Sequence, residues 1–238
     1  MFSAKNPDGI LVDADYSQIE LRLLAVYSKC EKMIEAFNSG RDFHTETAAK
    51  VFGVPVDEVT PSMRKTAKAV NFGIIYGISE YGLADNLKIS PKQAAEFIKK
   101  YFETYPEVRD FMNENVRKAR ETGYAVTAFG RKRLIREINA SNYNLRSFGE
   151  RAAMNMPLQG TAADIIKMAM VNVFKRLKRE NLRSELILQV HDELIIDTVR
   201  GEEEIVKKLL KEEMENAVQL SVRLTAEVSC GKSWFECK

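Results

Sequence analysis

The stretch from Leu186 to Asp197 constrains this chain most strongly, because two aliphatic runs in it flank three polar residues. Both runs, Leu-Ile-Leu-Gln-Val and Leu-Ile-Ile, are short and apolar, which is typical of buried strands. His191, Asp192 and Glu193 separate them, so the sequence predicts a hairpin with a polar apex. Adjacent carboxylates at such an apex are costly to desolvate without a positive partner, and a divalent metal ion is one candidate. A solvated turn explains the same residues equally well.

Composition favours an ordinary globular protein. The 238 residues are 45% hydrophobic, which is enough for a sizeable core in one large domain or two smaller ones. The formal charge is only +2, so a nucleic-acid surface must arise from local clustering of basic residues. We expect no membrane association, because no apolar run reaches membrane-spanning length and the first residues lack a signal-peptide pattern. Three cysteines without metal-ligand spacing indicate reduced thiols and a cytoplasmic protein.

A second acidic strand is predicted near the beginning of the sequence. Residues 9–15 follow a Pro-Asp-Gly turn and precede a helical pattern, so they are expected to form a strand. Asp13 and Asp15 share one face of it, and two acids on a buried face require a nearby cation. Ser17 and Glu20 have the spacing of a capping box, which gives Glu20 a purely structural explanation as the partner of the Ser17 amide.

A long helix is predicted over residues 64–77, and one of its faces carries an unusual stripe. The stripe residues recur every four positions: Arg64, Lys68, Phe72 and Tyr76. Its basic half suits phosphates and its aromatic half suits a sugar and base, so the stripe fits a nucleoside triphosphate. An ordinary surface helix with one aromatic residue packed inward is the simpler explanation.

Two further helices are predicted over 144–156 and 160–178, with a break at Pro157. Arg151, Asn155 and Gln159 recur at the same spacing of four just around that break. An arginine and two carboxamides form a donor-rich face that suits base edges and sugar oxygens. A polar face packed on a neighbouring loop explains them equally well.

The order of predicted elements indicates an α+β fold. A strand is followed by many helices, a short hairpin near residues 124–135, the two helices around Pro157, the acidic hairpin, a helix and an edge-type strand. We therefore expect an antiparallel sheet with packed helices and a largely helical insertion between residues 31 and 120. The short hairpin carries Arg131, Lys132 and Arg133, which fit either phosphate contact or plain solvated charge.

Three stretches together resemble motifs A, B and C of the family A, DNA polymerase I type, DNA polymerases. They are Asp-Tyr-Ser-Gln-Ile-Glu-Leu-Arg at 15–22, Arg-Lys-Thr-Ala-Lys-Ala-Val-Asn-Phe-Gly-Ile-Ile-Tyr-Gly at 64–77 and Gln-Val-His-Asp-Glu at 189–193. Their order and separations match the family, and the stretches 41–47 and 156–164 are similar to further family hallmarks. The resemblance covers nearly the whole chain from about Gly9 onward.

This resemblance implies a fold and an activity. It implies a palm formed by residues 1–30 and 121–238, with fingers formed by residues 31–120. The implied enzyme is a DNA-directed DNA polymerase, a nucleotidyltransferase that joins a deoxynucleoside triphosphate to a primer 3′-hydroxyl. Two Mg²⁺ ions are the implied cofactors, because this transfer uses one ion for the attacking oxygen and another for the triphosphate.

The resemblance also implies roles for the matching residues. Asp15 and Asp192 would bind the metal ions, together with the main-chain carbonyl of Tyr16, and Glu193 would be a supporting catalytic acid. Lys68 would be catalytic as well as a triphosphate contact. Glu20 resembles the steric gate that fills the space of a ribose 2′-hydroxyl. The implied nucleotide contacts are Gln18, Glu20, His44, Arg64, Lys68, Phe72 and Tyr76, and the implied primer contacts are Arg151, Asn155, Gln159 and His191.

The sequence departs from the family pattern at its beginning. Family members carry a thumb, further palm strands and often exonuclease domains ahead of motif A, whereas this sequence starts just short of that motif. Thumb contacts with phosphates supply much of the DNA affinity. We therefore expect weak affinity for primer-template DNA and assign no proofreading to this chain. We expect a monomer, and the chain is a fragment of a longer polypeptide, a truncated gene product or one part of a complex. A non-catalytic remnant that binds nucleotide or DNA is the alternative, and Glu20 argues against a related RNA polymerase.

Overall fold

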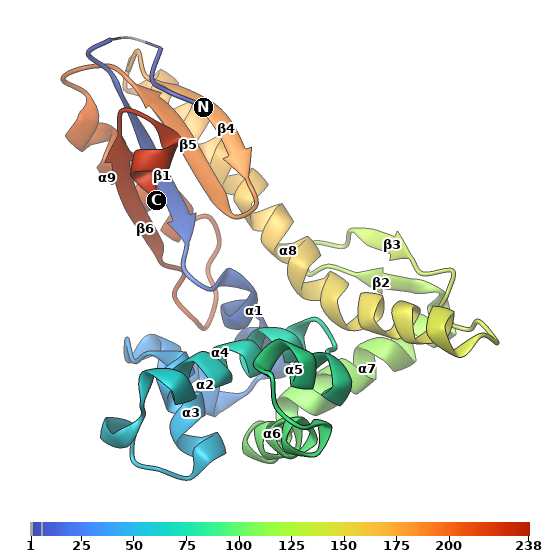
Figure 1. Ribbon diagram of the computed structural model, residues 1–238. Helices are drawn as coiled ribbons and strands as arrows, with labels where there is room; N and C mark the ends of the chain where they lie inside the picture. Colours follow the sequence, from blue (N-terminus) through green and yellow to red (C-terminus); the bar gives the residue numbers. More distant parts are fainter. Residues whose placement is uncertain (1, 6) are drawn as a thin grey trace. The chain divides into compact units, whose positions relative to one another are not determined.

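The acidic hairpin and the acidic strand predicted from the sequence pair with one another in a single antiparallel sheet. In the computed structural model, which describes residues 2–5 and 7–238, this sheet has four strands (Figure 1). Their order across the sheet is β4 (Glu185–Val190), β5 (Glu193–Thr198), β1 (Ile10–Tyr16) and β6 (Ala226–Gly231). The predicted α+β class with an antiparallel sheet is confirmed.

The chain divides into two compact units. One unit contains the residues up to Ile19 together with Ala162–Lys238, and it holds the four-stranded sheet. The other unit is Glu20–Thr161 and is mostly helical. The boundaries of these units differ from the predicted palm and fingers boundaries at residues 30 and 120, and the assignment of those two domains stays a prediction.

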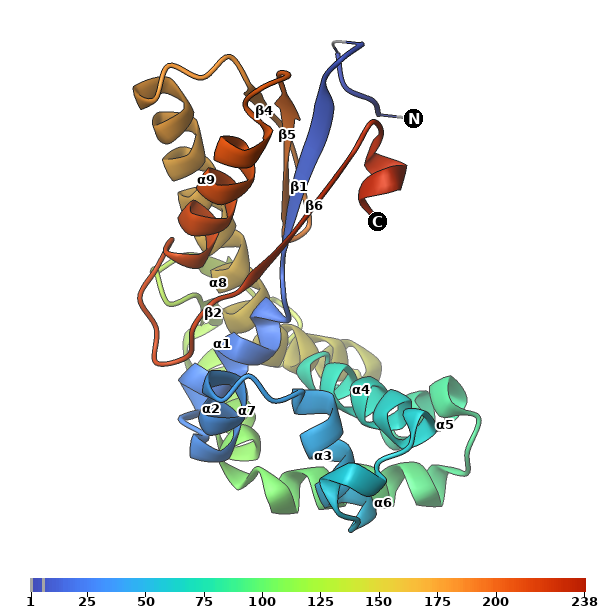
Figure 2. The same cartoon turned by 90° about the vertical axis from the view of Figure 1, so that its left-hand side faces the viewer.

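The two faces of the sheet carry different side chains because neighbouring residues of a strand point in opposite directions. Tyr16 points to the face covered by α9 (Glu203–Glu215), where its hydroxyl donates a hydrogen bond of 2.6 Å to the carbonyl of Met214. Asp13 and Asp15 point to the opposite face, where the short helix η2 (Trp234–Cys237) lies (Figure 2). One face of the sheet is therefore apolar and the other is acidic.

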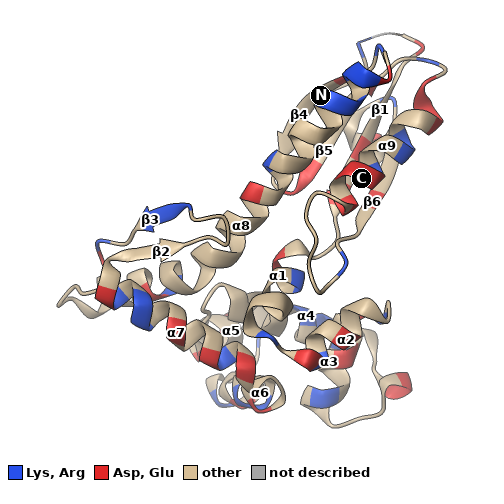
Figure 3. Ribbon diagram, turned by 180° about the vertical axis from the view of Figure 1, so that it is seen from behind, with Lys and Arg blue, Asp and Glu red and all other residues tan. Residues whose placement is uncertain are grey.

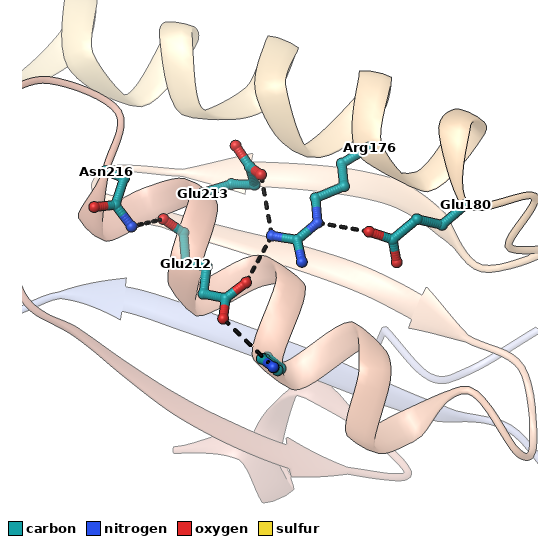
Figure 4. A network of polar contacts seen from close by, with 6 residues as sticks. Arg176, Glu180, Glu212, Glu213 and Asn216 are labelled. Atoms are coloured by element: carbon teal, nitrogen blue, oxygen red, sulfur yellow. Dashed lines mark hydrogen bonds and ion pairs between the residues drawn. The ribbon is translucent and has the colours of Figure 1, made fainter.

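An ion-pair network joins α9 to the last turns of α8 (Tyr143–Arg179). The guanidinium of Arg176, whose side chain is 19% exposed, donates to Glu180 at 2.8 Å, to Glu212 at 2.8 Å and to Glu213 at 3.1 Å (Figure 4). The hydrogen bond with Glu180 is the largest of the effects that raise the pKa of Arg176 above its ordinary value. A partly buried network of this kind holds α9 more firmly than exposed single pairs do.

The predicted helix break at Pro157 is wrong, because α8 runs without interruption from Tyr143 to Arg179 with Pro157 inside it. Proline removes one helical hydrogen bond and crowds the preceding turn, at a cost of about 3 kcal/mol. Ala153, Leu158 and Thr161 are fully buried around it, and the Thr161 hydroxyl donates to the Pro157 carbonyl at 2.5 Å. Burial of both flanking turns therefore outweighs the local preference of proline.

Three helices of the second unit begin at residues that cap them. Thr60, Ser79 and Ser90 each accept a hydrogen bond from an amide in the first turn that follows, and Ser90 forms a complete capping box with Gln93. The elements are α1 (Ile19–Ser28), α2 (Glu31–Asn38), α3 (Phe43–Phe52), η1 (Val56–Glu58), α4 (Pro61–Ile75), α5 (Glu80–Leu87), α6 (Pro91–Thr104) and α7 (Pro106–Thr122).

The short basic hairpin follows α7 as predicted. Its strands are β2 (Tyr124–Val126) and β3 (Lys132–Leu134), and basic side chains occupy β3 (Figure 3). Ala125 and Ile135 anchor the hairpin in an apolar cluster with residues of α7 and α8. Arg131, Lys132 and Arg133 are exposed, and their contact with phosphates stays a prediction. Among the described residues, helices with the length and apolar character of a membrane span are absent.

Candidate active site

Acidic side chains from β1 and from the β4–β5 hairpin come together at one end of the sheet. Asp15 is the cross-strand partner of Glu193, and the Tyr16 amide donates a hydrogen bond of 3.1 Å to the Asp192 carbonyl. Burial and, next, the neighbouring Asp192 carboxylate raise the pKa of Asp15 to about 6. The two predicted metal-binding aspartates therefore lie close enough for their charges to repel one another.

The backbone on either side of these acids adopts an uncommon conformation. Gln18 has a φ of 55° just after β1, and His191 has a φ of 51° in the loop between β4 and β5. Such left-handed conformations cost a residue with a side chain about 1–2 kcal/mol. The Gln189 side chain holds the second of them by donating a hydrogen bond of 2.6 Å to the His191 carbonyl.

Lys238 neutralises the two acids that are most deeply buried. Asp13 is 1% exposed and Glu193 is 5% exposed. The Lys238 Nζ atom lies 3.3 Å from Asp13 Oδ2 and also contacts Glu193 Oε2. Burial and the charge of Glu193 raise the pKa of Asp13, and Lys238 opposes that rise. Glu193 is therefore partly neutralised by a lysine that the sequence analysis did not identify.

Lys238 forms ion pairs with Asp13 and Glu193, and it only partly offsets the charge of Asp15 from a greater distance. The carboxylates of Asp15 and Asp192 and the carbonyl of Tyr16 are hard oxygen donors, the kind that Mg²⁺ prefers. The described residues contain no set of three or more His, Cys, Asp or Glu side chains arranged around a common metal position. The predicted ligand set has two side chains and one main-chain oxygen, so the residues present fit it.

The stripe of α4 faces outward in the helical unit. Arg64 and Lys68 are exposed, Phe72 is half-buried, and Tyr76 at the end of the helix is 46% exposed. The half-buried Phe72 agrees with the simpler explanation of one aromatic residue packed inward, whereas Tyr76 is open to solvent. The stripe is accessible to a ligand along its length.

A cavity of about 710 Å³ opens beside this stripe. Lys68, Phe72 and Tyr76 line it together with Arg151 of α8. Gly77 makes this approach possible, because a Cβ atom there would lie 2.8 Å from the Arg151 Cγ atom, and its φ is +64°. The cavity therefore brings together a predicted primer contact and three predicted nucleotide contacts.

The other residues of the predicted primer face differ in their surroundings. The Asn155 side chain donates a long hydrogen bond of 3.4 Å to the Ile75 carbonyl at the end of α4. Gln159 lies one turn further along α8 and is exposed. His191 belongs to the sheet unit, in the loop that carries Asp192. Their contact with a primer stays a prediction.

Arg64 of the stripe is paired with an acid, Asp42. Its Nε atom donates to Asp42 Oδ2 at 2.5 Å and its Nη2 atom donates to Asp42 Oδ1 at 3.3 Å. Burial pushes the pKa of Asp42 up, but the hydrogen bonds from Arg64 and Thr45 outweigh it and bring this pKa to about 2. A triphosphate at Arg64 would have to compete with Asp42.

His44 lies buried between α3 and α4. It is 2% exposed, its ring centre is 5.7 Å from that of Phe72, and the Asn71 amide nitrogen is 2.9 Å from its Nδ1 atom. Burial lowers the pKa of His44 to about 4, although Asp42 acts in the opposite direction. The imidazole is therefore neutral near pH 7.

Glu20 and Tyr76 meet although 56 residues separate them in sequence. The Tyr76 hydroxyl donates a hydrogen bond of 2.9 Å to Glu20 Oε2. Glu20 therefore has a partner beyond its own helix, and the capping pattern is not its whole explanation. Two predicted nucleotide contacts from different segments are joined by this bond.

Three residues of these sites were missed from the sequence. Asn71 gave a usable signal, because asparagine is a poor helix former and lies between apolar residues in the interior of a helix. Asp42 precedes α3 and has the ordinary appearance of a helix cap, so its bond to Arg64 was hidden. Lys238 gave no signal at all, since its role depends on the topology of the sheet.

The comparisons with known proteins point in one direction. The model of DNA polymerase family A matches residues 1–236. DNA polymerase I of Caldicellulosiruptor bescii is 56% identical over 234 residues, which are 98% of this chain and 28% of that protein. DNA polymerase I of Bacillus subtilis is 50% identical over 237 residues, which are 100% of this chain and 27% of that protein. The chain thus spans less than a third of the length of these relatives.

A solved structure agrees with these relatives. It is described as the POL domain of Pol1 from M. smegmatis in complex with DNA primer-template and dNTP. It is similar to this chain with a TM-score of 0.93 and 45% sequence identity, and the match covers 99% of this chain and 41% of that one.

Proposed function

This chain belongs to DNA polymerase family A, and from that premise we propose that it forms the nucleotidyl-transfer core of a DNA-templated DNA polymerase. In the proposed reaction the primer 3′-hydroxyl attacks the α-phosphorus of a deoxynucleoside triphosphate. A new P–O bond to the primer forms, the bond to the pyrophosphate breaks, and the hydroxyl proton is released. Primer-template DNA and deoxynucleoside triphosphates are the proposed partners, and the cytoplasm of a bacterium is the proposed location.

The observation that carries this proposal is the closeness of Asp15 and Asp192. Burial and then the Asp192 carboxylate raise the pKa of Asp15 to about 6, and the charge of Lys238 offsets only part of that rise. Two Mg²⁺ ions, when bound, would stabilise the negative charge that develops on the attacking and leaving oxygens. Asp15, Asp192 and the Tyr16 carbonyl would hold them, and Glu193, which Lys238 fixes in place, would support this group from behind.

The exposed stripe of α4 supports a triphosphate site. Arg64 and Lys68 offer positive charge to the phosphates, and Lys68 would also stabilise the charge that the departing pyrophosphate acquires. Phe72 offers a ring for the sugar. Gln18 and His44 are proposed as further contacts with the nucleotide.

The donor-rich face of α8 supports contact with the primer-template duplex. Arg151 and the carboxamides of Asn155 and Gln159 would donate to acceptors in the minor groove. His191 is also proposed to contact the primer terminus. Arg151 already lies in the cavity beside α4, which suits a residue that links the nucleotide to the duplex.

Primer extension by the chain itself tests the proposal. The assay uses a primer-template duplex, deoxynucleoside triphosphates and Mg²⁺ at high protein concentration and low salt, because the affinity for phosphates falls steeply with salt. We expect template-directed extension. Binding of nucleotide without any extension would instead identify a non-catalytic binding module.

Replacement of Glu20 by alanine is expected to raise the incorporation of ribonucleotides. The carboxylate is held by the Tyr76 hydroxyl and would exclude a 2′-hydroxyl from its position. Its removal should narrow the preference for deoxyribonucleotides over ribonucleotides by on the order of 10²-fold, the scale of discrimination that a well-fitted site achieves. The measurement is single-nucleotide incorporation with matched deoxyribonucleotide and ribonucleotide substrates.

The Tyr76→Phe variant provides the matched control for Glu20. It keeps the ring and removes only the hydroxyl that holds the carboxylate, so we expect a smaller loss of sugar selectivity than in Glu20→Ala. Unchanged selectivity in Glu20→Ala would mean that this residue only caps a helix. The loss of sugar selectivity in Glu20→Ala should occur while the unfolding temperature of the variant stays that of the unchanged protein.

A further inference from the structure

The contact between His44 and Asn71 is the polar feature of the helical unit that the proposed mechanism leaves unexplained. The two side chains come from α3 and α4, which pack against one another. Asn71 is fully buried, and its Nδ2 atom lies 2.9 Å from the Nδ1 atom of His44. A buried asparagine in the interior of a helix is unfavourable for the helix itself. We therefore look for the role of Asn71 in its contact with His44.

The geometry assigns the proton of the imidazole. Burial keeps His44 neutral near pH 7, and the charged groups around it are Asp42, Arg64 and Lys68. A neutral imidazole has one donor nitrogen and one acceptor nitrogen. Because the Asn71 amide donates to Nδ1, that nitrogen is the acceptor and the hydrogen lies on Nε2.

The other polar atom of each side chain, Oδ1 of Asn71 and Nε2 of His44, agrees with this assignment. The Oδ1 atom of Asn71 is enclosed and has no hydrogen-bond partner among the described residues, so donation is the contribution that this amide makes. The Nε2 atom of His44 is not one of the enclosed polar atoms without a partner, and it forms no hydrogen bond in the described part of the chain. It is the nitrogen that a ligand can reach.

We infer that Asn71 is a positioning residue, which holds His44 in the Nε2–H tautomer so that the ring donates a hydrogen bond to a phosphate oxygen of the nucleotide. This role rests on the proposed function of the α4 stripe. Phosphate oxygens accept hydrogen bonds and do not donate them, so the opposite tautomer would present a lone pair to them. Arg64 and Lys68 supply positive charge to the same phosphates, and the hydrogen bond from His44 orients them.

The tautomer can be measured without any nucleotide. The chain has two histidines, so a long-range ¹H–¹⁵N correlation spectrum of histidine-labelled protein contains two imidazole patterns, and a His191→Gln sample assigns them. We expect the pattern of a neutral ring with hydrogen on Nε2 and a hydrogen-bonded lone pair on Nδ1. A ring with hydrogen on Nδ1 overturns the inference, because Asn71 would then accept from His44.

A double-mutant cycle tests the consequence for binding. Titration with deoxyadenosine triphosphate and Mg²⁺ gives the dissociation constants of the unchanged protein and of Asn71→Leu, His44→Gln and the double variant. We expect Asn71→Leu alone to weaken binding about tenfold, the scale of one hydrogen bond. In the His44→Gln background the same change should have less than a twofold effect. Asn113→Leu, at an exposed position of α7, is the matched control and should bind normally.

The outcomes separate this inference from the function on which it rests. If Asn71→Leu weakens nucleotide binding equally with His44 and with Gln at position 44, Asn71 only stabilises the fold. The inference would then fail, although the proposed nucleotide binding would stand. Absence of nucleotide binding by the unchanged protein would overturn both. Should Asn71→Leu fail to fold, the tautomer spectrum of the unchanged protein still decides the arrangement of the pair.

Discussion

Replacement of Asp192 by asparagine is expected to abolish primer extension while leaving the fold intact. Asparagine keeps the shape of the side chain and removes the charge that would hold Mg²⁺. Loss of a few kcal/mol of transition-state stabilisation lowers the rate on the order of 10³-fold or more. Single-turnover extension with excess protein is the appropriate measurement, because it separates the chemical step from weak DNA binding.

The stability of this variant distinguishes a catalytic loss from misfolding. The Asp192 carboxylate contributes to the raised pKa of Asp15, so its removal relieves a repulsion. We therefore expect Asp192→Asn to unfold at the same temperature as the unchanged protein or at a higher one. Asp197→Asn lies on the same hairpin and should extend primers normally. Extension by Asp192→Asn within tenfold of the unchanged protein would exclude Asp192 as a metal ligand.

Replacement of Lys238 by methionine is expected to destabilise the sheet unit. The change leaves Asp13 and Glu193 buried beside one another without the ammonium that contacts both. Removal of one partner from a buried ion pair costs about 3–5 kcal/mol. The Lys238 side chain is 48% exposed, so solvent screening reduces the expected loss of unfolding free energy to about 2 kcal/mol. Urea unfolding at pH 7.5 measures it, with Lys232→Met as the exposed control.

The pH dependence of this loss has a definite sign. The folded pKa of Asp13 is already raised above its ordinary value of 3.8, and Lys238 opposes that rise. Without Lys238 the pKa of Asp13 in the folded state rises further above its value in the unfolded state. The unfolding free energy of Lys238→Met therefore falls as pH rises from about 4 through the folded pKa.

Two pH limits check this assignment. The difference in stability between the two proteins should shrink as the pH falls toward 4, because the raised pKa of Asp13 favours its uncharged form there. In the unchanged protein the contribution of Lys238 is present below its unfolded pKa of 10.5 and is lost as pH rises through its raised folded value. A difference in stability that grows toward acid pH would contradict the proposed ion pair.

Local patterns were sufficient to predict the elements that carry the site. Alternation of aliphatic runs around His191 specified the hairpin, and a spacing of four specified the exposed face of α4. Each of these features depends on residues within a few positions of one another, which is the range over which sequence periodicity is informative.

Contacts between distant residues were beyond such reasoning. Asp13 and Lys238 meet because β1 and β6 pair and η2 returns over the sheet, and no pattern in either segment encodes that return. The bond between His44 and Asn71 depends on how α3 packs on α4. The error at Pro157 has the opposite origin, because a reliable local rule was overruled by the burial of neighbouring turns.

The central place of β1 in the sheet affects the order in which the protein folds. Both neighbours of β1 belong to the last quarter of the sequence, whereas Glu20–Thr161 is one continuous segment. During translation the first strand therefore leaves the ribosome long before its partners, and its apolar edge is open to aggregation until they arrive. Pulsed hydrogen exchange during refolding should find the amides of the helical segment protected before those of β1.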